Sequence, residues 1–232
     1  MLGAFLSMGM PLEILESELG KLGLDEFSLD VKEKRAGDKL VRDVDVVLTE
    51  PENAGIDPYS GRYRNYGDVK KIIDDSNITS TAKKLSKKIF DVKAEAEARV
   101  HGVSVDQVQF HEKGAVDSIV DIVGTAIAFS HMDIDRVVST YVPTGYGTIM
   151  CACGELPVPA PAVVEILEKY WIPHYRSHVE MELLTPTGAS FLAALVDEYT
   201  QELKIPVQAG FGYGTGKKDT GLEPLKLAVC EE

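Results

Sequence analysis

The sequence has 232 residues, of which 44% are hydrophobic and 26% are charged, and its formal net charge at pH 7 is −13. This composition is ordinary for a soluble globular protein, and there is no run of about 18 apolar residues that would cross a membrane. So acidic a chain is also a poor candidate for nonspecific nucleic-acid binding, which needs lysine and arginine to displace the counterions of the phosphates. We therefore expect no membrane and no nucleic acid as partner.

The first 65 residues predict a helix, two strands and a long loop. A helix is expected over 11–22, because Pro11 suits a first helical position and leucines recur on one face. Strands are expected at 27–31 and 40–48, with a turn between them. Residues 49–65, TEPENAGIDPYSGRYRN, contain two prolines, two glycines and no periodicity. They predict a long exposed loop.

The rest of the chain predicts helices interspersed with short strands. Helices are expected at 68–75, 79–100, 116–130, 159–170 and 185–199, and extended segments at 105–110, 179–184 and 225–229. Residues 136–150 predict a strand, a turn near 145–147 and a second strand. The segment 116–130 is apolar around most of its circumference, which predicts a buried helix. Strands do not alternate regularly with helices, so we expect an α+β fold with a short, mostly antiparallel sheet in a single domain spanning 1–232.

The segment FHEKGAVDSIVDIVG, Phe110–Gly124, is the first candidate site. Asp117 and Asp121 lie four residues apart and share one helix face. Burying two carboxylates among apolar neighbours is costly unless they are paired or bind a cation. With His111 and Glu112 they would form a mixed nitrogen and oxygen ligand set suited to Mg²⁺, Mn²⁺ or Ni²⁺. Alternatively, Asp117 complements a helix dipole and Asp121 pairs with a lysine.

The cysteines form a second candidate site. Cys151 and Cys153 are two residues apart, so they can share one face of a strand and bind a soft metal ion. The C-x-C spacing alone is weak evidence, because cysteine is also a common small core residue. Together with Cys230 they make an odd number, which does not suggest a disulfide framework and favours a reduced protein in the cytoplasm.

Two further segments could bind an anion. The helix start at Thr185, Pro186, Thr187 and Gly188 offers hydroxyls and free backbone N–H groups, although it would serve equally well as a helix cap. The glycine-rich segment 212–218 would let the backbone approach a phosphate beside two lysines. In that second segment the candidate contacts are Gly214, Gly216 and Lys217. It lacks the spacing of a P-loop, and glycine-rich turns are common.

Several segments together resemble the LarC family, whose members insert nickel into the pincer cofactor of lactate racemase and related enzymes. The resemblance extends over nearly the whole chain, with the motifs in the family's order. The matching segments are 110–124, Pro143–Gly147, Gly154–Ala162, Leu183–Leu195 and Gly212–Asp219.

The resemblance implies a CTP-dependent cyclometallation, a lyase-class reaction. Nickel would enter an anionic pyridinium-3,5-bisthiocarboxylate mononucleotide, with Mg or Mn accompanying the CTP. His111, Glu112 and Asp117 are then expected to act in catalysis, and Thr185, Thr187, Gly188, Gly214, Gly216 and Lys217 to bind the mononucleotide. The expected metal ligands are His111, Asp117, Asp121, Cys151 and Cys153.

The chain departs from the family pattern at three places. Gln109 and Cys153 stand where the family typically has histidine, and residues 49–65 contain none of the histidines often found in that loop. At the two ends, Met1 coincides with the methionine of an internal family motif, and the chain stops where the family continues into a CTP-binding portion. We therefore expect an upstream strand in the reading frame, and a partner chain that carries the C-terminal portion.

Three functions remain open from the sequence. The chain could insert nickel itself. It could be a non-catalytic module that binds metal or cofactor and needs a second chain, or it could be a metal-dependent hydrolase of a phosphorylated small molecule, with the carboxylates and His111 activating a water. A homo-oligomer is compatible with each of these functions.

Overall fold

The structure is a computed structural model that describes residues 1–49, 64–110, 115–151, 154–202, 204–213 and 223–230. The helices within these ranges are α1 (Leu2–Ser7), α2 (Leu12–Gly20), α3 (Tyr66–Asp75), α4 (Ser80–His101), the 3-10 helix η1 (Val105–Gln107), α5 (Val116–Met132), α6 (Pro161–Lys169) and α7 (Pro186–Leu195). The strands are β1 (Phe27–Ala36), β2 (Lys39–Leu48), β3 (Val138–Ser139), β4 (Val142–Thr144), β5 (Thr148–Cys151), β6 (Gly154–Pro157), β7 (His174–Arg176), β8 (Glu198–Tyr199), β9 (Gln208–Tyr213) and β10 (Leu225–Val229). The predicted α+β class is confirmed.

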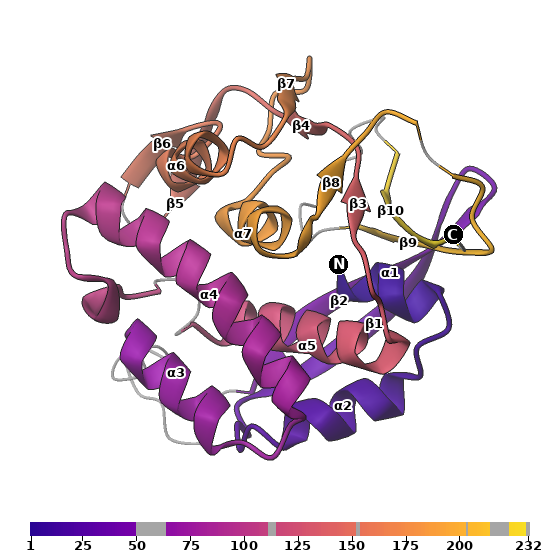
Figure 1. The fold of residues 1–232 in the computed structure, drawn as a ribbon, viewed down its shortest axis with the longest axis horizontal. Helices are drawn as coiled ribbons and strands as arrows, with labels where there is room; N and C mark the ends of the chain where they lie inside the picture. Colours follow the sequence, from indigo (N-terminus) through magenta and orange to yellow (C-terminus); the bar gives the residue numbers. More distant parts are fainter. Residues whose placement is uncertain (50–63, 111–114, 152–153, 203, 214–222, 231–232) are drawn as a thin grey trace.

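The long helix α4 organises the helical part of the molecule. It begins at the N-cap Thr79, whose hydroxyl accepts from the Ala82 N–H at 3.1 Å, and ends at Gly102 with φ +68°. Around it pack α3, α5, α6 and α7 (Figure 1). None of the helices in the described ranges is long and apolar enough to span a bilayer.

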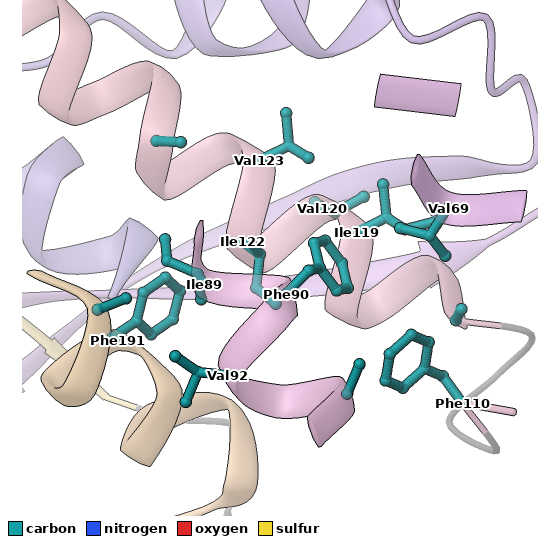
Figure 2. Close-up of a cluster of buried hydrophobic side chains, with 14 of the residues drawn as sticks. Val69, Ile89, Phe90, Val92, Phe110, Ile119, Val120, Ile122, Val123 and Phe191 are labelled. Atoms are coloured by element: carbon teal, nitrogen blue, oxygen red, sulfur yellow. The ribbon is translucent and has the colours of Figure 1, made fainter. Parts of the chain in front are cut away.

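The core lies where α4 crosses α5. The prediction that 116–130 forms a buried helix is confirmed, because most apolar side chains of α5 are fully buried. Figure 2 shows this core, with Val69 of α3, Phe90 of α4, Ile119 and Ile122 of α5, and Phe191 of α7 in one cluster. Burying such side chains contributes about 2 kcal/mol each to the hydrophobic term of folding.

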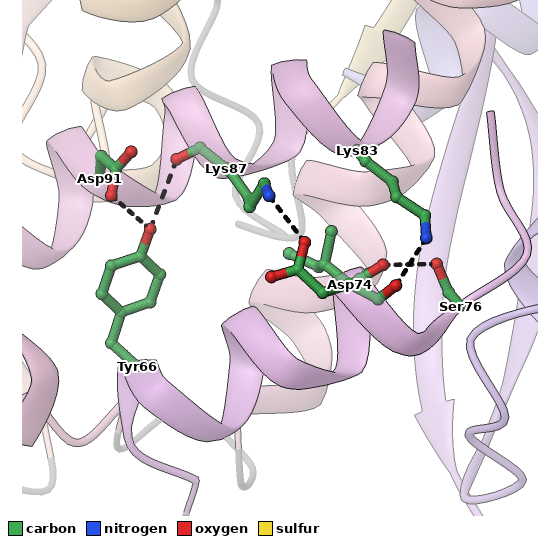
Figure 3. Close-up of polar contacts among 7 residues, drawn as sticks. Tyr66, Asp74, Ser76, Lys83, Lys87 and Asp91 are labelled. Carbon is green, nitrogen blue, oxygen red and sulfur yellow. Dashed lines mark hydrogen bonds and ion pairs between the residues drawn. The ribbon is translucent and has the colours of Figure 1, made fainter. Parts of the chain in front are cut away.

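Polar contacts join α3 to α4 beside this core (Figure 3). The hydroxyl of Tyr66 donates to Asp91 at 2.6 Å, and the ammonium of Lys87 donates to Asp74 at 2.6 Å. Burial and the neighbouring carboxylate of Asp91 raise the pKa of Tyr66 above its ordinary value. The Tyr66 ring also contacts Phe110, with centroids 6.2 Å apart. The start of α3 therefore contacts the first residue of the first candidate segment.

The largest sheet has the strand order β1-β2-β9-β10. Its hairpin β1–β2 is antiparallel, as predicted for the strands on either side of the 36–38 turn, and β9 joins β2 in parallel. Helix α1 packs so closely on this sheet that glycine is required at the contact. A Cβ on Gly3 would lie 2.0 Å from the Arg42 carbonyl oxygen, and one on Gly210 would lie 2.1 Å from that of Ala4.

Three two-stranded sheets complete the fold in the described part of the chain. The pairs β3–β8 and β4–β7 are parallel, and β5–β6 is antiparallel. The antiparallel pairs of the molecule run over four to ten residue pairs and the parallel ones over two or three. Most of the strand pairing is therefore antiparallel, as expected.

Several predicted elements were wrong in detail. Residues 179–184 form no strand, and 105–107 form a 3-10 helix instead of an extended segment. The strand, turn and strand predicted over 136–150 are present, since β4 and β5 lie on either side of a bend at Gly147. These two strands do not pair with each other, because β4 pairs with β7 and β5 with β6, and Tyr146 donates its N–H to the Val179 carbonyl at 3.2 Å. Helix α7 ends at Leu195, because the chain then turns into β8. Short strands paired over long sequence distances carry little periodic signal.

Candidate functional site

The first candidate segment lies at the start of α5. Phe110 is buried and packs against Phe90, with ring centroids 5.7 Å apart. On the other side of 111–114, Ala115 caps α5 with the positive φ of +70° and is fully buried. His111 and Glu112 themselves lie outside the described residues. The two residues that flank their segment are thus anchored in the core.

The two aspartates of this segment differ in burial. Asp117 is half-buried in the first turn of α5, where a carboxylate complements the helix dipole. Asp121 is exposed, so the predicted buried pair of carboxylates was wrong. Burial lowers the pKa of the Met1 α-amino group, and the nearby charge of Asp121 raises it, which places Asp121 towards α1. The sequence pattern showed an apolar circumference, but not which side of α5 reaches the surface of the protein.

The predicted helix start at Thr185 is confirmed. Thr185 is the N-cap of α7, Pro186 follows at the first helical position, and the Thr185 hydroxyl accepts from the Gly188 N–H at 3.1 Å. Thr185 is exposed, and Thr187 and Gly188 are half-buried. The first turn of α7 therefore presents its hydroxyls partly to solvent.

Removing this cap should destabilise the chain. Thr185→Ala leaves the Gly188 N–H without its side-chain acceptor, and we expect a loss of about 1 kcal/mol in the free energy of unfolding. Urea unfolding followed by circular dichroism measures it. The matched control is Thr81→Ala, since Thr81 is exposed in the first turn of α4 and is not its cap. Equal stability of the two variants would contradict the capping role.

A residue that the sequence did not single out connects these two sites. Lys93 of α4 is 2% exposed, and its ammonium donates to the Ser118 hydroxyl at 2.6 Å and to the Thr187 hydroxyl at 3.0 Å. It also lies 5.2 Å from the ring centroid of Phe110. Ser118 is next to Asp117 in the first turn of α5, and Thr187 is in the first turn of α7. The structure therefore brings the candidate metal segment and the candidate anion-binding turn to one lysine.

The sequence contained one signal for Lys93. Helix α4 has several lysines, most of which face solvent, and Lys93 looks like one more of them. However, Ile89 and Phe90 precede it by four and three residues, and Ala96 follows by three, so it lies on the apolar stripe. A lysine on that stripe is rarely buried without a specific role.

The second candidate site is only partly described. The sulfur of Cys151 is in a disulfide, whereas Cys230 is free and exposed. The expectation of reduced cysteines was thus wrong for Cys151, since an odd cysteine count does not say which sulfurs lie close in space. The Cys151 sulfur is 3.2 Å from the Gly154 carbonyl oxygen, but it has no proton to donate, so this is a contact and not a hydrogen bond. It would bind metal only after reduction, because the ligand is the thiolate. Cys153 lies outside the described residues.

The glycine-rich segment has a structural explanation at its start. Gly212 lies in β9, where a Cβ would come within 2.6 Å of the Ala4 backbone nitrogen in α1. Its glycine is required by helix packing, whether or not a phosphate binds nearby. Gly214, Gly216 and Lys217 lie outside the described residues, so their expected contacts to the mononucleotide stay predictions.

Within the described residues, no group of three or more histidine, cysteine, aspartate or glutamate side chains could hold a metal ion. Of the predicted ligands, Asp117, Asp121 and Cys151 are described, and they form no such group. The metal site predicted from the sequence also needs His111 and Cys153, so it remains a prediction.

Comparison with known proteins decides the family. A family described as "Nickel insertion protein" matches residues 1–231. The chain belongs to this family. It is 42% identical to the pyridinium-3,5-bisthiocarboxylic acid mononucleotide nickel insertion protein of Acetivibrio thermocellus over 95% of the chain and 54% of that protein. It is 39% identical to the protein of the same name from Geobacillus kaustophilus, over 100% of the chain and 56% of the relative.

A third relative, from Clostridium kluyveri and of the same name, is 39% identical over 94% of the chain and 55% of its own length. The chain thus spans about half the length of the curated relatives it matches. No solved structure matches it. The family assignment confirms the resemblance found in the sequence motifs.

Proposed function

We propose that this chain takes part in inserting nickel into a pyridinium-3,5-bisthiocarboxylic acid mononucleotide, the reaction in the names of its relatives. The observation that carries the proposal is the meeting of the first turns of α5 and α7 at Lys93. One turn bears Asp117, a candidate metal ligand, and the other bears the hydroxyls of Thr185 and Thr187. A substrate with both an anionic group and a nickel-binding group would need these two functions side by side.

Charge supports this assignment. The protein carries a net charge of −13, so an anionic mononucleotide needs a local positive field. Lys93 and the N-terminal ends of α5 and α7 supply one, because helix N-termini carry partial positive charge and unpaired N–H groups. Nickel in this reaction is cargo, and imidazole with carboxylate suits it. His111 and Asp117 would hold the ion while Glu112 accepts the proton released when the metal–carbon bond forms.

The finer features of the activity also belong to this proposal. CTP, with Mg or Mn, would be bound by the portion of the relatives that this chain does not span. A second chain that carries this portion, self-association, and a cytoplasmic site of action are compatible with it. The names of the relatives favour nickel insertion over the alternative of a hydrolase.

Nickel affinity tests the proposed site. We expect His111→Ala and Asp117→Ala each to weaken Ni²⁺ binding at least about tenfold in calorimetry, because each removes a proposed ligand of the ion. Mutation of a residue that only supports a metal ligand already lowers metal affinity by about tenfold or more. The controls are His178→Ala and Asp75→Ala, which change exposed residues of the same kinds. Unchanged affinity in both site variants would show that the ion binds elsewhere.

The second experiment separates an enzyme from a module. The purified chain is mixed with Ni²⁺, CTP and the organic mononucleotide, and nickel incorporation is followed by mass spectrometry. Product formed without a second protein would exclude the module. Product formed only after addition of the C-terminal half of a relative would show that the chain supplies only the site for the metal and the mononucleotide.

A further inference from the structure

Lys93 is in an unusual environment for a lysine. Its neighbours on α4, Phe90 and Ala94, are fully buried, and the Phe110 ring lies against its ammonium. Removing an ammonium group from water is costly, and apolar side chains of similar volume often replace buried charges without loss of stability. Methionine at this position would fill the core between the helices as well as lysine does. The presence of lysine therefore points to a task other than filling the core.

The hydrogen bonds of Lys93 define that task. An ammonium group only donates, so the hydroxyls of Ser118 and Thr187 must both accept from it. A hydroxyl that accepts in this way directs its own hydrogen elsewhere, and a charged donor polarises it. Ser118 is buried, but Thr187 is half-buried at the start of α7. The Thr187 hydroxyl is thus set as a donor at the surface of the first turn.

We propose that Lys93 is a positioning residue that makes the Thr187 hydroxyl a hydrogen-bond donor towards an anionic group of the substrate. The anion is a phosphate or carboxylate of a pyridinium mononucleotide, so the inference rests on the proposed function. Lys93 acts through Thr187 and also fixes the first turn of α7 against that of α5. Its positive charge is bound to Ser118, the residue after Asp117 in the chain, and a positive charge at that place does not help to bind a cation.

This role predicts that binding of the anion and of the metal ion respond differently to loss of the lysine. With nicotinate mononucleotide as the probe, Lys93→Met should weaken binding about tenfold, since a charge-assisted arrangement is lost. The affinity for Ni²⁺ alone should stay unchanged or increase. A merely structural lysine would affect both ligands together. Calorimetry measures both affinities, with circular dichroism confirming that the variant is folded.

Two further variants complete the test. Lys88→Met removes an exposed lysine from the same helix and should bind both probes as the wild type does. Ser118→Ala removes a hydroxyl acceptor of Lys93 and should weaken mononucleotide binding about threefold, with Ni²⁺ affinity unchanged. If Lys93→Met does not fold, Ser118→Ala decides the question by the same comparison.

The outcomes separate this inference from the proposed function. Wild-type chain that binds both probes, with Lys93→Met losing only the mononucleotide, supports it. Unchanged mononucleotide binding in Lys93→Met, or equal loss of both ligands, overturns it and leaves the proposed function standing. Wild-type chain that binds neither probe overturns both.

Discussion

Gly145→Ala is expected to lower the free energy of unfolding by about 3 kcal/mol, which is at the upper end of the cost of overpacking. A Cβ at this position would lie 1.6 Å from the carbonyl oxygen of Met181 and 2.8 Å from its carbonyl carbon. Both are backbone atoms, so the chain after β4 and the chain at 179–181 would have to separate. Urea unfolding followed by circular dichroism measures the loss.

Gly20→Ala is the control for Gly145→Ala. A Cβ on Gly20 would meet nothing within 4 Å, and the residue lies in the last turn of α2. Alanine loses less backbone entropy than glycine on folding, so this variant should be more stable by about 0.5 kcal/mol. Wild-type stability of Gly145→Ala would mean that these two segments are not in contact.

Phe90→Ala is expected to cost about 4 kcal/mol of stability, as truncations of large buried aromatic residues do. Phe90 is fully buried and packs against both Tyr66 and Phe110, with ring centroids 6.1 and 5.7 Å away. Its removal leaves a cavity between α3, α4 and the residue preceding His111. The same urea experiment measures the effect, provided that the variant is expressed at reduced temperature.

Trp171→Ala serves as the control for this truncation. Trp171 is an aromatic residue of comparable size that is 89% exposed, and surface substitutions usually change stability by less than about 0.5 kcal/mol. If Phe90→Ala were as stable as Trp171→Ala, the aromatic cluster beside the candidate site would not be packed as described. A folded Phe90→Ala chain would also allow its Ni²⁺ affinity to be measured.

The sequence predicted the elements whose signal is local. Helices α2, α4 and α5 follow from apolar spacing, and the cap at Thr185 from hydroxyl and proline chemistry at a helix start. The β1–β2 hairpin follows from two runs of strand-forming residues around Gly37. It did not predict α1 or β9, because the contact of these two elements joins opposite ends of the chain and their glycines resemble a loop.

The candidate site was predictable in its parts but not in its assembly. Each helix start was recognisable by itself, since capping and carboxylate placement depend on neighbours within a turn. The two helix starts meet at Lys93 because of the way α4, α5 and α7 cross. The periodicity of a single helix does not determine such a crossing. The exposure of Asp121 was missed for the same reason, because it depends on how α5 packs among α1, α2, α4 and α7.

The packing of α1 on β9 affects the order in which the protein folds. The Ser7 hydroxyl donates to the carbonyl oxygen of Phe211 in β9, and the two residues are 204 positions apart in the chain. During synthesis the α1 segment therefore leaves the ribosome long before the strand on which it packs. The face of α1 that packs on β9 stays uncovered until that strand has been made, and contacts of such high sequence separation form slowly.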